Sequence, residues 1–119
     1  MLTSEFLLLL LPCIVFLAMG IPFVMGVVPP NGIYGFRIKR TLQDPEVWYS
    51  ANRVAGLWSI WTGIAAAAVS TATFVLGLRL MAAALVELLP FLIGIVGLYA
   101  HVFRVIHRVT IRKQKIENT

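Results

Sequence analysis

The chain is poor in the residues that build catalytic and metal centres. It has one cysteine, Cys13, and only five acidic residues among 119. A single cysteine excludes a disulfide framework within one chain, and we interpret Cys13 as a small buried hydrophobic residue. No serine nucleophile with a nearby base is recognisable, and no acidic pair of the kind that general acid–base catalysis uses. We therefore predict that the protein is not an enzyme and holds no cofactor.

Charge is also scarce, because charged residues make up 13% of the chain and hydrophobic residues 60%. Ordinary soluble domains are about a quarter charged. We predict an all-α polytopic membrane protein of one domain, with a structured loop between the first two spans. Its expected parts are spans over 6–28, 54–78 and 80–102, a loop over 29–53 and a basic tail over 103–119.

The spans carry signals of their own. No Lys or Arg precedes the first span and Glu5 has the wrong sign, which argues against a cleaved signal peptide. The middle of the second span, residues 63–73, consists mostly of Gly, Ala, Ser and Thr, so this face should pack on another helix. Gly77 to Arg79 forms a tight turn that makes the second and third spans an antiparallel hairpin.

Basic residues predict the orientation. Nine of the ten Lys and Arg residues lie in the loop or the tail, and Arg79 is the exception. The positive-inside rule then places the N-terminus outside and the loop and C-terminus in the cytoplasm. We expect a tail that continues the third helix and binds anionic lipid. The tail is too short to predict nucleic-acid binding, and His101 and His107 are wrongly spaced for a metal site.

Within the loop, Asp44-Pro45-Glu46 is a strong helix start. A helix from Pro45 would run into the second span and place Trp48, Asn52 and Gly56 on one face. The loop resembles the SdpI family of bacterial membrane proteins, which includes an immunity protein against a secreted toxic peptide. The matching positions are Pro30, Asn31, Tyr34, Gly35, Phe36, Arg37, Thr41, Leu42, Asp44, Val47, Trp48, Tyr49, Asn52, Arg53 and Gly56.

The resemblance implies a protein of the bacterial inner membrane and a set of binding residues, namely Asn31, Gly35, Arg37, Thr41, Trp48 and Asn52. Where the family commonly has Thr after the arginine, this chain has Ile38. We expect Arg37 to fold under the bundle and bond Asn52 or backbone carbonyls, with Trp48 at the membrane interface. Two alternatives stay open: these residues fasten the loop, or they line a polar site for an anionic lipid headgroup or a peptide carboxylate.

Glu87 is the remaining candidate, because an ionisable residue inside a span is costly and usually faces a bundle interior. Arg79 or the hydroxyls of Ser70, Thr71 and Thr73 are its expected partners. It could serve helix packing, or bind a ligand, a proton or a partner subunit.

Two functions follow from this pattern. The first is peptide-toxin immunity or signalling, in which the loop binds a peptide or a partner. The second is an accessory structural subunit, in which the small-residue face of the second span and Glu87 pack against a larger complex. A three-helix protein has little interior, so we expect a homo-oligomer or a larger membrane complex in both.

Overall fold

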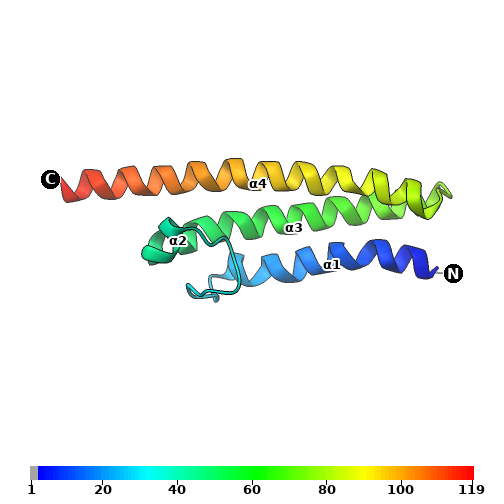
Figure 1. The fold of residues 1–119 in the computed structure, drawn as a ribbon, viewed down its shortest axis with the longest axis horizontal. Helices are drawn as coiled ribbons and strands as arrows, with labels where there is room; N and C mark the ends of the chain where they lie inside the picture. The colour runs from blue at the N-terminus through cyan, green and yellow to red at the C-terminus, as the bar shows by residue number, and fades with distance from the viewer. Residues whose placement is uncertain (1–2) are drawn as a thin grey trace.

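The computed structural model describes residues 3–119, and these form four helices and no strand: α1 (Ser4–Met25), α2 (Lys39–Gln43), α3 (Pro45–Val75) and α4 (Leu80–Glu117). The three long helices are each long and apolar enough to cross a membrane. In Figure 1, α3 lies between α1 and α4, and the loop with α2 covers one end of α3. We call this the loop end, and the end with the α3–α4 connection the turn end. The predicted all-α membrane fold is confirmed.

Local chemistry sets where the helices begin and end. The Asp44 side chain accepts a hydrogen bond from the Glu46 amide (3.0 Å), so α3 begins at Pro45 as predicted and continues unbroken through Asn52 and Gly56. Helix α1 ends at Met25, because Gly26 adopts a left-handed conformation (φ 70°), three residues before the end of the predicted span. Gly77 (φ 70°) reverses the chain between α3 and α4.

The small residues of α3 allow a close approach of α1. A Cβ atom on Gly56 would lie 2.7 Å from the Gly20 carbonyl oxygen, and one on Gly63 would lie 2.8 Å from the Cys13 carbonyl oxygen. Ala66, Ser70 and Thr73 are buried on the same face. The predicted packing of the small-residue face against another helix is therefore confirmed, and the helix is α1.

Helices α3 and α4 reach beyond α1 at the loop end. Their 31 and 38 residues correspond to about 46 and 57 Å, against about 33 Å for the 22 residues of α1. We call the projecting pair the stem. Its core consists of Val47, Ala51, Ala55, Val102, Ile106 and Val109. The basic tail is therefore helical, as predicted, and packs on the first turns of α3.

Candidate functional site

Asn52 holds the loop onto α3. It is 1% exposed, and its Oδ1 accepts a hydrogen bond from the Phe36 amide at 2.6 Å. Its Nδ2 donates to the Trp48 carbonyl at 3.0 Å and the Phe36 carbonyl at 3.4 Å. Gly35 makes this approach feasible, because its φ is 116° and a Cβ there would lie 2.8 Å from Asn52 Oδ1. The side-chain amide of Asn52 thus supplies hydrogen bonds to the backbone N–H and carbonyl of Phe36.

Thr41 and Trp48 are two further anchors, and both are fully buried. The Thr41 hydroxyl accepts from the Ile38 amide (3.0 Å) and lies within donating distance of the Phe36 and Ile38 carbonyls. Trp48 Nε1 donates to the Val28 carbonyl at 2.9 Å. The indole of Trp48 is not exposed to the surroundings as in an interfacial aromatic belt, because it fills the space beneath the loop.

Asn31 and Arg37 shape the outer part of the loop. Asn31 Oδ1 accepts from the amides of Ile33 (2.9 Å) and Tyr34 (2.7 Å), which fixes a turn. Arg37 is exposed, and its Nη1 donates to the Gly32 carbonyl. The expectation that it folds under the bundle onto Asn52 is wrong, since Asn52 is already occupied by backbone groups. Its alternative partner, a backbone carbonyl, is the one observed.

Tyr34 is an anchor that the sequence did not reveal as such. Its hydroxyl donates to the Met19 carbonyl at 2.6 Å, and its ring packs on that of Phe23, with centroids 4.5 Å apart. Burial raises the pKa of the Tyr34 hydroxyl. The loop is thus tied to α1 as well as to α3. We call residues 27–44, held in this way, the cap.

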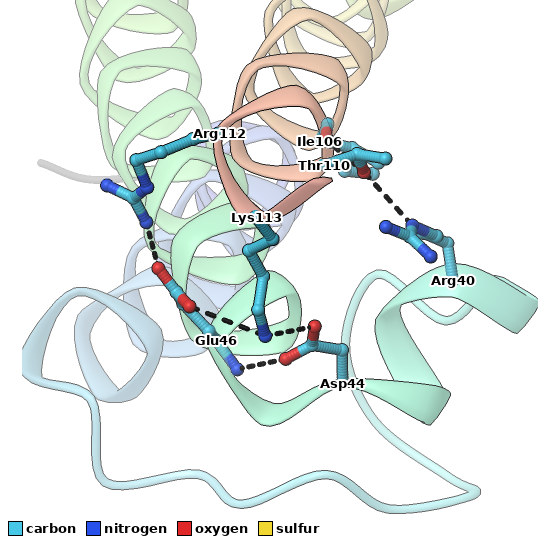
Figure 2. Close-up of polar contacts among 7 residues, drawn as sticks. All are labelled: Arg40, Asp44, Glu46, Ile106, Thr110, Arg112 and Lys113. Atoms are coloured by element: carbon cyan, nitrogen blue, oxygen red, sulfur yellow. Dashed lines mark hydrogen bonds and ion pairs between the residues drawn. The ribbon is translucent and has the colours of Figure 1, made fainter. Parts of the chain in front are cut away.

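Charged residues fasten the end of α4 to the cap and to the start of α3 (Figure 2). Lys113 Nζ lies 2.5 Å from Asp44 Oδ2 and 3.5 Å from Glu46 Oε2, and Arg112 pairs with Glu46. Arg40 Nε donates to Thr110 Oγ1 at 3.0 Å. The hydrogen bond from Lys113 holds the pKa of Asp44 below its usual value. We call these six residues the clamp.

The clamp is not predicted from the sequence, because the basic residues of the tail are assigned there to anionic lipid alone. The feature of the sequence that could have indicated the clamp is the hairpin turn at Gly77. An antiparallel hairpin places residues equally far from its turn opposite each other, which brings the end of the tail to Asp44 and Glu46. Those acidic residues had been interpreted only as a helix start.

Glu87 lies away from the cap, in the part of α4 that faces α1. It is 3% exposed, and Cys13 Sγ lies 3.3 Å from its Oε1 in a hydrogen bond. The expected partners do not bind it: Arg79 is exposed near the turn, and the hydroxyls of Ser70, Thr71 and Thr73 bond to carbonyls of their own helix. Cys13 is buried as predicted, and it is also the polar partner that the sequence did not indicate.

Glu87 also borders a groove between α1 and α4 with a volume of about 430 Å³. Apart from Glu87, its walls are apolar and include Leu8, Pro12, Phe16, Ala84, Leu88 and Phe91. Away from this groove, Trp58 Nε1 on α3 donates a hydrogen bond to His101 Nδ1 on α4 at 3.1 Å. Among the described residues no cluster of His, Cys, Asp and Glu could hold a metal ion.

The site residues therefore form two separate places. Gly35, Thr41, Trp48 and Asn52 build the inside of the cap, Asn31 and Arg37 shape its outer part, and Glu87 lies in the groove within the helical bundle. Three apolar helices with a folded cap at one end define a small polytopic membrane protein.

Comparison with known families gives a more specific result. The chain matches the model of the SdpI/YfhL protein family over residues 27–106, which include the cap, α3 and most of α4. The protein belongs to this family, as the resemblance of its loop indicated. Searches of curated proteins and of solved structures gave no significant match.

Proposed function

We propose that the protein acts in peptide-toxin immunity or signalling, and that it binds a peptide or a partner protein through the outer face of the cap. One observation carries the proposal: the family-matched polar residues are used to hold the cap rigid. The side chains of Asn52, Thr41 and Trp48 all bond to backbone groups. A loop that served only as a connection would need no such support.

The outer face of the cap offers suitable binding groups. Ile33 is 89% exposed at the tip of the turn that Asn31 fixes. Arg37 and Lys39 are exposed beside it in the sequence. An exposed aliphatic residue and two exposed cations within one short loop, on a preformed backbone, favour an amphipathic or acidic partner, because little ordering entropy is lost on binding.

The charge distribution supports an orientation within the bacterial inner membrane. Nine of the ten basic residues belong to the cap, the stem and the end of α4, so the cap would face the cytoplasm and the N-terminus the outside. Arg112 and Lys113 have acidic partners in the clamp. Arg104 and Arg108 are exposed and are the better candidates for contact with anionic lipid headgroups.

The accessory-subunit reading receives less support. It relied mainly on a small-residue face that was free for another subunit, and this face packs on α1 of the same chain. Self-association and assembly into a larger complex remain predictions.

The proposal is tested by expressing the protein in a bacterium that is sensitive to a secreted, membrane-active peptide. We expect survival with the native chain and loss of protection with Ile33→Ser or Arg37→Ala at unchanged protein levels. Ile116→Ser is the matched control, because Ile116 is 67% exposed near the end of α4 and lies outside the cap. Full protection by both cap variants would contradict binding through this face.

A further inference from the structure

The groove between α1 and α4 is a consequence of how the three helices pack. Each of these two helices packs mainly on α3, and they contact each other little. The resulting groove is open toward the surrounding lipid, and aromatic and aliphatic side chains such as Phe16, Leu88 and Phe91 form its walls. Its volume of about 430 Å³ lies in the range of sites that bind small molecules or the side chains of a peptide.

The buried carboxyl of Glu87 gives this groove a specific chemistry. Glu87 lies about 10 Å along α4 from Leu80, at a depth where a polar group needs partners. Its Oε1 accepts from the Cys13 thiol, a weak donor, and this is the one side-chain hydrogen bond of Glu87 among residues 3–119. The second carboxyl oxygen makes no bond within the described chain, and Glu87 borders the groove.

We propose that the groove binds an apolar, membrane-embedded peptide segment that carries one basic side chain, and that this side chain pairs with Glu87. The inference rests on the proposed peptide function and names the class of peptide that the membrane part would select. The apolar walls would hold the segment, and the carboxylate would select the cation, because an opposite charge at this depth removes the cost of burying either group alone.

Charge distinguishes this peptide segment from two other occupants of the groove, a lipid acyl chain and a second copy of this chain. A lipid acyl chain would fill the apolar walls but would leave Glu87 without a new partner. A second copy of this chain has no Lys or Arg in its first 36 residues, in residues 54–78 or in residues 80–103. Its Arg79 lies in the turn, outside the lining of the groove. The basic side chain must therefore come from a different molecule.

The test uses two model peptides and the full chain in lipid nanodiscs. Both are apolar helices of about 20 residues, one with a central Lys and the other with Leu in its place. Energy transfer from the native tryptophans to a dye on the peptide measures binding. We expect the Lys peptide to bind at least about tenfold more tightly than the Leu peptide.

Three variants separate the groove from general partition into the membrane. Glu87→Gln should bind both peptides equally, and Leu8→Phe, which narrows the groove without changing Glu87, should weaken both. Val96→Phe is the control, because Val96 is exposed on α4 and lies outside the groove lining. Helical content and elution volume verify folding, and Leu8→Phe remains informative if Glu87→Gln does not fold.

Equal binding of the two peptides by the native chain would overturn the inference and indicate a groove that holds acyl chains. A preference for Lys that survives in Glu87→Gln would also overturn it. These results are distinct from failure of the proposed function, which is measured as survival of cells carrying the cap variants.

Discussion

Asn52 illustrates how single residues determine the cap. It is a buried amide on a membrane helix, and its hydrogen bonds to the Phe36 backbone join two segments that are 16 residues apart. Gly35 complements it, since only a residue without a side chain leaves room for the amide. The two residues act as a pair: one supplies the hydrogen bonds and the other the space.

Replacing Asn52 with Leu should therefore destabilise the protein. The Phe36 amide would lose its partner, at a cost of about 1–3 kcal/mol. Unfolding by SDS in mixed micelles measures the change in free energy. Arg53→Ala is the control, because Arg53 is the exposed next residue of α3 and should change stability little. Equal stability of Asn52→Leu and the native chain would show that the amide does not hold the cap.

Gly35→Ala should also be destabilising, by about 1–3 kcal/mol, because a positive φ disfavours any Cβ and this one would meet Asn52. Gly32→Ala offers a matched comparison within the same loop: its Cβ would have no neighbour within 4 Å. Thermal unfolding in detergent should separate the two variants. If both alanines had the same effect, close packing at Gly35 would not be the cause.

Sequence resemblance drew attention to these residues as a group, and it could not supply their orientation. Once Asp44 and Pro45 are recognised as a helix start, helical spacing places Trp48, Asn52 and Gly56 on one face of the helix. Arg37 was misplaced because nothing in the sequence shows that backbone groups of Phe36 already occupy Asn52. The partner of Glu87 was missed for a similar reason: Cys13 is 74 residues away, and the rotation of α1 decides which side chain it presents.

At the scale of elements, the stem gives the cap its support. The apolar residues of the α4 tail pack against the first turns of α3, and the clamp closes the same contact at its end. The sequence predicted the three spans, the hairpin and a helical tail. It did not predict that the tail packs on protein, since an amphipathic basic helix is equally compatible with a membrane surface.

Asp44→Asn should remove the ion pair between Asp44 and Lys113 from the clamp while keeping the helix cap, because both side chains cap α3 well. The pKa of Asp44 is lowered in the folded protein, so its stabilisation is present above the unfolded value of about 4 and is lost as pH falls through the folded value. We expect a loss of about 1 kcal/mol or less at pH 7, and convergence with the native chain below about pH 4.

Thermal unfolding of the two proteins across pH 3–7 measures this difference. Lys115→Met is the control for removing one tail charge, because Lys115 is exposed and takes no part in the clamp. A difference between Asp44→Asn and the native chain that stays constant with pH would show that the ion pair with Lys113 is not its source.

The contact between α1 and α3 makes a second prediction at this scale. Gly56→Val should separate the helices, because its Cβ would meet the Gly20 carbonyl, and backbone cannot move aside as a flexible side chain can. The expected cost is about 1–3 kcal/mol or more. Ala68→Val, on the exposed face of α3, should be nearly neutral in the same SDS unfolding assay. Equal effects would exclude close packing as the role of Gly56.

The whole molecule divides into a membrane part and a capped end. Its longest dimension is 63 Å, which exceeds a hydrocarbon core of about 30 Å, so the stem and cap project beyond it. In this arrangement the groove with Glu87 would face lipid, and the cap would be available to a partner in water. Composition and charge predicted this division, and the hydrogen bonds that make the cap rigid became apparent only from the structure.

The proposed function requires the cap to be folded against the stem at the cytoplasmic side. Single-cysteine variants test this directly in a Cys13→Ser background: Ile33 is 89% exposed, and Thr41 is fully buried. A membrane-impermeant maleimide should modify Ile33→Cys in inverted membrane vesicles and not in right-side-out ones, and should react at least about tenfold more slowly with Thr41→Cys. Equal reactivity at both positions, or labelling of Ile33→Cys from the periplasmic side, would contradict it.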